Sequence, residues 1–436
     1  MIDPSSIGYL VLLGMFCLIA LHVPIGIAMS VAGLVGVGSI IGFDPAIALF
    51  GIEPSASLAS QELAIIALFL LMGNFASAAG LSSDLYNLAY AFIGHKRGGL
   101  AMATITTCAG FGAVCGSSLA TTATMTRIAL PEMEKRSYSV QLSAGSIAAG
   151  STLGVIVPPS VLLVLYAILT EQFVTALFVA AIFPALIAII FYLVAVWIYV
   201  IIKPNSAPPS EYLPWKVKRD ALKRSWGVIL LAVIVSGGIY SGFFTVSEAA
   251  ACGASFAIIF AFMRGKLTYK IFFENLKETA ASTSLIYLII IGASIFSYAI
   301  SLSGLPDIIV SNIQNLNLHP LIIIILIQII YIILGSIFDT VAAMVITLPF
   351  VFPLIVGMGF DPIWWGVINV VVMEMGMITP PIGLNVFVIH GMASRIPLSS
   401  IYSGIVPFLF SDLLRLLLIT FFPAICLWLP KTMGLL

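Results

Sequence analysis

The fold is decided by a stretch that reads Gly335-Ser336-Ile337-Phe338-Asp339-Thr340, continues to Leu348-Pro349, and is followed by Met377-Ile378-Thr379-Pro380-Pro381-Ile382-Gly383. A similar pattern occurs about 220 residues earlier, as Gly116-Ser117-Ser118-Leu119-Ala120-Thr121, then Leu130-Pro131, then Gly154-Val155-Ile156-Val157-Pro158-Pro159. Each copy has a tip of small residues that runs to Leu-Pro, and then an apolar helix that a Pro-Pro pair interrupts. Two copies with broken helices at matching positions are typical of secondary transporters whose site lies between the repeats.

The composition of the chain is that of a polytopic membrane protein. Of its 436 residues, 61% are hydrophobic and only 8% are charged. So few charges could not cover the surface of a soluble protein of this length, whereas lipid is an adequate solvent for it. The formal net charge of +0 implies nothing about nucleic acid, and no basic patch is present to support nucleic-acid binding. The five cysteines lie in apolar stretches without CxxC spacing, so we expect buried thiols rather than a disulfide or metal framework.

The placement of charges predicts how the chain crosses the membrane. Lys and Arg are absent from the first 95 residues, and fifteen of the eighteen then fall in clusters that the positive-inside rule places in the cytoplasm. Two apolar segments, 98–135 and 319–356, are too long for one span and carry small polar residues near their middles, which predicts re-entrant hairpins. Ten further segments are predicted to be spans: 7–28, 29–50, 62–80, 140–168, 173–202, 226–244, 247–264, 282–302, 362–393 and 398–430.

These spans predict an all-α protein of two inverted-topology repeats. Each repeat holds five spans and one hairpin, and because five is odd the second repeat must be inverted, which places both termini outside. The predicted parts are a first repeat, 1–202, with an outer arm at 51–62; a cytoplasmic linker, 203–225; and a second repeat, 226–436, with an interfacial helix at 265–279.

The hairpin tips and Pro-Pro breaks are the features best suited to carry chemistry. Proline removes a backbone donor, and the turn around it frees carbonyl groups that no helix satisfies. With Ser and Thr hydroxyls, such carbonyls suit a sodium ion, and helix N-termini offer N–H groups to an anionic substrate. The alternative, that each pair only kinks a span, is disfavoured because the two pairs occupy repeat-related positions.

A few polar residues within apolar runs are further candidates. Asp339 adjoins the second tip, where a carboxyl is costly to bury, so it is a candidate for a cation site, with a structural hydrogen-bond acceptor as the alternative. Glu374 is expected to brace the second break rather than to contact a ligand. Asn385 follows that break and is a candidate ligand for substrate or ion. Asp412 and Arg415 are three residues apart and are expected to pair with each other.

At these residues the chain resembles the large membrane subunit of tripartite ATP-independent periplasmic (TRAP) transporters, within the broader ion transporter superfamily. The resemblance covers essentially the whole chain, and its most specific parts are Gly116-Ser117-Ser118 through Leu130-Pro131, Val157-Pro158-Pro159, Gly335 to Pro349, and Glu374 through Asn385. It implies an elevator-type secondary transporter of the bacterial inner membrane, driven by a sodium gradient and needing no other cofactor. It also implies two partners, a small four-span membrane subunit and a periplasmic substrate-binding protein. Because only Met1–Ser6 precede the first predicted span, the small subunit is expected to be a separate chain.

The resemblance also implies which residues form the sites. One sodium site would involve the first tip and first break, through Gly112, Ser117, Ser118 and Gly154. A second would involve Gly335, Asp339, Gly376 and Thr379. The substrate would lie between the tips and breaks, near Ser118, Thr121, Thr340, Pro158, Pro380 and Asn385. The first break has Val157 where the second has Thr379, so a hydroxyl is missing there. The sodium site at the first break must therefore depend more on backbone carbonyl oxygens.

The function expected from these features is sodium-driven import of a small organic anion, with sialic acid and C4-dicarboxylate as the two leading substrates. The alternative is a stand-alone carboxylate symporter, coupled to sodium or protons, that needs no binding protein. An intramembrane enzyme is disfavoured because Ser117 and Ser118 have no sequence-local base and no Ser–His or paired-Asp arrangement is present. A passive channel is disfavoured because discontinuous helices in inverted repeats fit alternating access better than an open pore.

Overall fold

The computed structural model describes residues 3–315 and 318–436, and every regular element in these ranges is a helix. Seven of the described helices are long and apolar enough to cross a membrane, and up to nine spans result if each of two bent helix pairs counts as one. The prediction of an all-α polytopic membrane protein is therefore confirmed. Met1 and Ile2, which belong to the short segment before the first span, lie outside the described residues.

The first half of the chain ends with a helical hairpin, a broken helix and a long helix. Its ten helices are α1 (Pro4–Ala20), α2 (Ile25–Ile41), α3 (Phe43–Ala59), α4 (Gln61–Ala78), α5 (Leu81–Ile93), α6 (Gly99–Cys115), α7 (Ser118–Lys135), α8 (Val140–Ile156), α9 (Val161–Thr170) and α10 (Val174–Ile202). The hairpin is α6 and α7, and the broken helix is α8 and α9, which meet at a bend of 43°.

The second half, counted here from the linker at residues 203–225, repeats this order of hairpin, broken helix and long helix. Its elements are η1 (Pro204–Ser206), α11 (Trp215–Arg224), α12 (Trp226–Ala232), η2 (Val233–Gly237), α13 (Gly238–Tyr240), α14 (Val246–Met263), α15 (Tyr269–Leu302), α16 (Leu305–Asn315), α17 (Pro320–Ile337), α18 (Thr340–Gly357), α19 (Pro362–Gly376), α20 (Leu384–Met392), α21 (Leu398–Phe421) and α22 (Ala424–Thr432). Here α17 and α18 form the hairpin, and α19 and α20 the broken helix. The recurrence of one element order is consistent with two repeats, while their inversion stays a prediction.

Two turns shift the first elements from their predicted boundaries. The predicted spans 7–28 and 29–50 correspond to α1 and α2, but a turn that contains His22, with φ 64°, separates them earlier than expected. Gly42, with φ 104°, ends α2 well before residue 50, because that backbone conformation suits glycine. Most of the arm predicted at 51–62 consequently belongs to a longer helix, α3, which ends at Ala59, while Gln61 already begins α4.

The second half departs from the predicted elements in other places. Residues 265–279 do not form a separate interfacial helix, because α15 continues without a break to Leu302. The sequence from Tyr269 to Ile291 contains neither Gly nor Pro, so nothing in it interrupts a helix. The last predicted span, 398–430, is divided into α21 and α22 at Phe422-Pro423, and the linker 203–225 contains α11.

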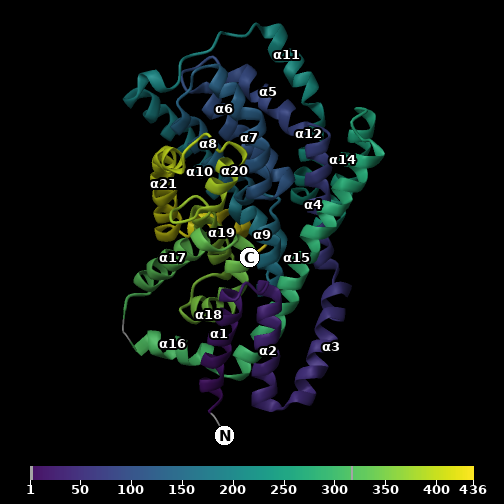
Figure 1. The fold of residues 1–436 in the computed structure, drawn as a ribbon, viewed down its shortest axis with the longest axis vertical. Helices are drawn as coiled ribbons and strands as arrows, with labels where there is room; N and C mark the ends of the chain where they lie inside the picture. The colour runs from purple at the N-terminus through teal and green to yellow at the C-terminus, as the bar shows by residue number, and fades with distance from the viewer. Residues whose placement is uncertain (1–2, 316–317) are drawn as a thin grey trace.

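The helices α2 and α15 cross at close range through glycine. A Cβ atom added to Gly292 would lie 2.2 Å from the carbonyl oxygen of Gly26, and one added to Gly33 would lie 2.7 Å from the backbone nitrogen of Phe296. Small residues let two helix backbones approach in this way within a membrane. Figure 1 shows α1, α2 and α3 at one end of the long axis of the molecule, and α11 at the other.

A buried polar network joins α8, α10 and α21. The Tyr192 hydroxyl donates to the Asp412 carboxylate at 2.5 Å and lies 3.2 Å from the Thr152 hydroxyl. Arg415 forms an ion pair with Asp412 at 2.8 Å, and both side chains are at most 2% exposed. The predicted pairing of Asp412 with Arg415 is therefore present within α21, and the Tyr192 hydrogen bond to Asp412 connects this helix to α10 of the first half.

Candidate functional site

Both hairpin tips place a capped helix N-terminus inside the protein. In the first tip, Ser117 is the N-cap of α7, and its hydroxyl accepts a hydrogen bond from the Ala120 N–H at 3.3 Å. In the second, Asp339 is the N-cap of α18, and its carboxylate accepts from the Val341 N–H at 3.1 Å. The partial positive charge of each helix N-terminus therefore points at the tip. Asp339 makes this structural hydrogen bond, and its other oxygen keeps lone pairs for a ligand.

Each hairpin crosses its own broken helix at a pair of glycines. In the first half, a Cβ on Gly112 would lie only 1.8 Å from the Cα of Gly154. In the second half, a Cβ on Gly376 would lie 2.5 Å from the carbonyl carbon of Gly335. All four glycines were predicted to belong to the two sodium sites. The structure brings them together two by two, with one pair at each crossing, so backbone groups of tip and break lie side by side.

The first crossing also collects hydroxyl oxygens. The Thr121 hydroxyl would lie 3.2 Å from a Cβ on Gly154, and it has no hydrogen-bond partner among the described residues although Thr121 is fully buried. Ser117 caps α7 nearby. An unpartnered hydroxyl beside free backbone at a helix break is suited to a cation. Thr121, predicted to contact substrate, thus lies beside Gly154, which was predicted for the first sodium site.

One backbone hydrogen bond joins the hairpin to the break at the second crossing, and another closes the break itself. The Gly383 N–H donates to the Ser336 carbonyl at 3.1 Å, and the Asn385 N–H donates to the Met377 carbonyl at 3.1 Å. The Thr379 hydroxyl donates to the Met375 carbonyl at 2.6 Å, which leaves its oxygen lone pairs free. The break therefore keeps a fixed shape, with Thr379 at its edge.

The two halves of the chain meet at the first tip. The Asn385 amide, on α20, donates to the Ser118 hydroxyl, on α7, at 2.8 Å and to the Ala148 carbonyl, on α8, at 3.4 Å. Ser118 is 5% exposed and Asn385 is fully buried. The structure therefore joins two residues that were predicted to bind substrate and that are 267 positions apart in the sequence.

The remaining predicted substrate residues are less closely associated. Thr340 begins α18 and is buried, but no hydrogen bond within the described ranges joins it to Ser118 or Asn385. The two prolines differ in exposure, since Pro158 is buried whereas Pro380 is exposed. The second break thus opens to the surface while the first is covered.

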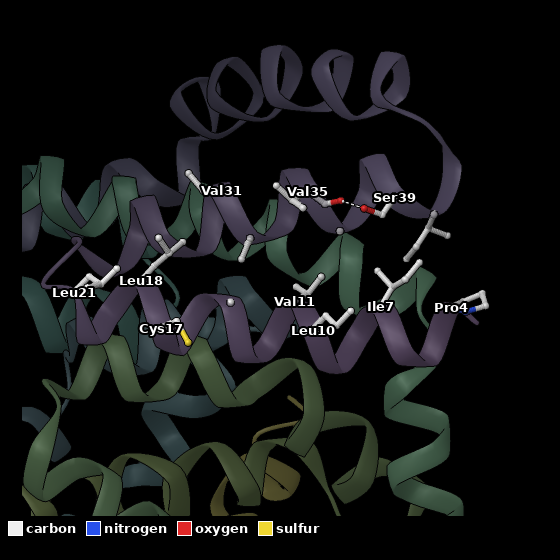
Figure 2. Close-up of a pocket in the computed structure, with 14 residues that line it drawn as sticks. Pro4, Ile7, Leu10, Val11, Cys17, Leu18, Leu21, Val31, Val35 and Ser39 are labelled. Carbon is white, nitrogen blue, oxygen red and sulfur yellow. Dashed lines mark hydrogen bonds between the residues drawn. The ribbon is translucent and has the colours of Figure 1, made fainter. Parts of the chain in front are cut away.

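Two of the cavities differ in character and in their distance from the tips. Figure 2 shows a groove of about 640 Å³ between α1 and α2, lined mainly by apolar side chains such as Leu10, Val11 and Val35. None of its lining residues belongs to a tip or a break. A polar cavity of about 400 Å³ instead lies against the first hairpin, between α7 and the helices α4 and α15.

This polar cavity contains a basic side chain close to the first tip. Its walls include Cys115 and Ala120, which flank the tip, and Arg127 farther along α7. The opposite wall contains Asn275 and Glu278 of α15. Arg127 is exposed and forms no ion pair among the described residues, so its guanidinium is available to an anion.

The sequence is similar to known proteins over nearly its full length. It matches the family described as "Tripartite ATP-independent periplasmic transporter, DctM component" over residues 12–425. It is 35% identical over 406 residues to the C4-dicarboxylate TRAP transporter large permease protein DctM of Pseudomonas aeruginosa, which covers 92% of this chain and 94% of that protein. The chain belongs to the DctM family of TRAP transporters. The predicted family is therefore confirmed, as is the expectation of a transporter rather than an enzyme.

Other members of the DctM family carry different substrate names. The sialic acid TRAP transporter large permease protein SiaM of Vibrio cholerae is 29% identical over 370 residues, 85% of this chain and 86% of that one. The isethionate TRAP transporter permease protein DctMQ of Oleidesulfovibrio alaskensis is 31% identical over 437 residues, which are 97% of this chain and 66% of that protein. Among solved structures, the YdaH transporter of Alcanivorax borkumensis has the same fold, with a TM-score of 0.60, 15% identity and 91% of each chain covered.

Proposed function

We propose that this protein is the transport subunit of a TRAP system that imports a small organic anion with sodium ions. The chain is a DctM-family membrane protein, and relatives of it are named for C4-dicarboxylate, sialic acid and isethionate. All three substrates carry an acidic group, which supports an anion as the transported class. The C4-dicarboxylate relative is the most similar of the three, which favours a dicarboxylate over sialic acid.

One observation carries the proposal, the paired crossings of hairpin and broken helix. Each crossing places a tip and a break in backbone contact, at Gly112 with Gly154 and at Gly335 with Gly376. Each tip presents the N-terminus of an 18-residue helix, α7 or α18. Carbonyl and hydroxyl oxygens at such breaks suit sodium, and helix N-termini suit a carboxylate. One ion at each crossing and the anion between the tips would use both kinds of group.

An elevator-type movement would connect this site to the two sides of the membrane. The polar cavity between α7 and the pair α4 and α15 separates the first hairpin from long helices that can act as a fixed frame. The Arg127 guanidinium in that cavity would attract an anion that leaves the tip toward the cytoplasm. The inverted repeats, a bacterial inner-membrane location and periplasmic termini belong to the same proposal.

The first experiment compares thermal unfolding of the purified protein in sodium chloride and in potassium chloride at equal ionic strength. A ligand that binds only the native state raises the free energy of unfolding by about 2.7 kcal/mol at a hundredfold excess over its Kd. We expect a rise in Tm that is specific to sodium. Equal curves in the two salts would contradict sodium binding by this chain and would favour proton coupling.

The second function to test is a stand-alone carboxylate symporter. The full-length relatives named as large permease proteins imply a small subunit, and the DctMQ relative, of which this chain covers 66%, has a name that joins M and Q. We propose a separate small subunit and a periplasmic binding protein as partners. Co-purification of a small membrane protein supports this, whereas rapid uptake by this chain alone in liposomes would contradict it.

A further inference from the structure

A short, strongly basic helix, α11, lies in the linker between the two halves of the chain. It spans Trp215–Arg224 and carries five basic residues and one acidic residue, Asp220, which leaves an excess of four positive charges. None of the five basic side chains forms an ion pair within the described ranges. The proposed sodium and anion sites use no residue of this helix, so its charge is free to serve another purpose.

One face of α11 holds the helix against α5. Lys218 is 6% exposed, and its ammonium group lies 4.0 Å from the centre of the Tyr212 ring and 5.9 Å from that of Phe92, which belongs to α5. Just after α11 ends, the Ser225 hydroxyl donates to the carbonyl of Asp84, also on α5, at 3.0 Å. The helix therefore has a fixed position, and its other faces have a fixed direction.

The faces of α11 that are turned away from α5 form two adjacent rows. Lys216, Arg219 and Lys223 are spaced i, i+3 and i+7, so they lie on one side of the helix, and all three are exposed. Trp215 and Leu222 are two helical turns apart and form the neighbouring row, with 69% and 47% of their surfaces exposed. A line of positive charge thus runs beside a line of apolar side chains.

The position of α11 in the chain places it at the membrane surface. The next helix, α12, begins the span that the sequence predicts at 226–244, and it follows α11 at a bend of 51°. Trp226, Ile229 and Val233 are 45%, 43% and 59% exposed, as expected of side chains that face lipid. Tryptophan is enriched where lipid meets water, and Trp226 stands at the start of this span. The bend therefore places α11 at the level of the phospholipid headgroups.

We propose that α11 binds the headgroups of anionic phospholipids at the cytoplasmic surface of the membrane. Lys216, Arg219 and Lys223 contact the lipid phosphates, while Trp215 and Leu222 enter the adjoining apolar region, which is the arrangement of an interfacial amphipathic helix. Charge complementarity selects this lipid class, because a zwitterionic phospholipid has no net charge to offset the basic row. The binding does not depend on sodium coupling.

A lipid held by α11 would also act on the first hairpin. The helix α5, on which α11 is packed, directly precedes the hairpin helices α6 and α7. The Tyr90 hydroxyl of α5 accepts a hydrogen bond from the Arg136 guanidinium, just after α7, at 3.0 Å. Anionic lipid would therefore hold the cytoplasmic base of this hairpin at the membrane surface.

The test is the lipid preference of the purified full-length protein in a non-ionic detergent. Binding of fluorescent phosphatidylglycerol and of fluorescent phosphatidylcholine is measured by anisotropy at low ionic strength. We expect the wild type to prefer phosphatidylglycerol, and the triple variant Lys216→Gln, Arg219→Gln and Lys223→Gln to bind it about tenfold or more weakly. A control variant loses three exposed charges from other segments that were predicted to be cytoplasmic, through Lys96→Gln, Arg97→Gln and Lys277→Gln. This control should keep the preference.

Further measurements separate lipid binding from loss of structure. Because the substituted side chains are exposed, Tm without added lipid should be the same in the wild type and both triple variants. If the α11 variant is less stable, Arg219→Gln alone should still weaken phosphatidylglycerol binding more than phosphatidylcholine binding. Leu222→Gln should weaken both to a similar extent. Equal affinity of the wild type for the two lipids, or a preference that the α11 variants retain, would overturn the proposal.

Discussion

The crossing of Gly112 with Gly154 allows a sharp test of how tightly the first hairpin is held. In Gly112→Ala the new Cβ would lie 1.8 Å from the Gly154 Cα, whereas ordinary contact begins at 3.4 Å. The helices α6 and α8 must therefore separate by about 1.6 Å, the difference between these two distances. The obstacle is backbone, which cannot rotate away as a side chain would. We expect a cost at the upper end of the range for overpacking, about 3 kcal/mol.

The assay is the thermal unfolding of purified variants that replace one glycine by alanine. Gly376→Ala brings its Cβ to 2.5 Å from the Gly335 backbone, so its Tm should fall less than that of Gly112→Ala. Gly391→Ala is the control, because nothing lies within 4 Å of its Cβ and alanine favours a helix. We expect Tm to rank Gly391→Ala highest, Gly376→Ala next and Gly112→Ala lowest. Equal values for Gly112→Ala and Gly391→Ala would refute the close crossing.

Three further substitutions test the charges. Asp339→Asn should weaken the sodium-dependent rise in Tm while the fold persists, because asparagine also caps α18 well; an unchanged rise would remove Asp339 from the ion site. Arg127→Gln should raise KM for an anionic substrate in proteoliposomes and leave Tm unchanged, since Arg127 is exposed, and an unaltered KM would exclude it from the anion's path. Asp412→Asn should lower the free energy of unfolding by about 3–5 kcal/mol, measured as a lower Tm, because buried Arg415 loses its ion-pair partner. Adding Arg415→Met should recover part of this loss. No recovery would show that the unpaired charge is not the cause.

The breaks and tips could be predicted from sequence because their signals are local. Pro158-Pro159 and Pro380-Pro381 interrupt helices wherever they occur, and the described helices end and restart around both pairs. The hairpin segment 319–356 corresponds closely to α17 and α18, with Asp339 between them. Composition was sufficient to predict a membrane protein, because a chain with 61% hydrophobic residues cannot cover its surface with polar groups as a soluble protein does.

The elements that were not predicted depend on contacts or on weak local signals. The helices α5 and α16 are short and precede the hairpins, where the apolar pattern does not separate them from neighbouring spans. The turn at His22 has no glycine or proline at the positive-φ position, so nothing in the sequence marked it clearly. The joining of 265–279 to the following span could have been anticipated from the absence of Gly and Pro.

In the candidate site, too, some features could be predicted from local sequence and others depend on how distant helices pack. The residues of each tip could be predicted because small side chains mark the point where the helix is interrupted, and this signal is local in the sequence. The proximity of Glu374 to Ser118 follows from the packing of α19 against the first half, which no spacing in the sequence records. Arg127 was visible as a charge, but its position in a polar cavity depends on where α4 and α15 lie.

The uninterrupted course of α15 has a mechanical consequence. Its 34 residues extend about 51 Å at 1.5 Å per residue, well beyond a hydrocarbon core of about 30 Å. The corresponding part of the first half is interrupted at Ser60, where α3 ends and α4 begins. One continuous helix, α15, thus packs beside two helices, α3 and α4, that are separated at Ser60. A change in the angle between α3 and α4 would be taken up at Ser60, whereas α15 has no break at which to bend.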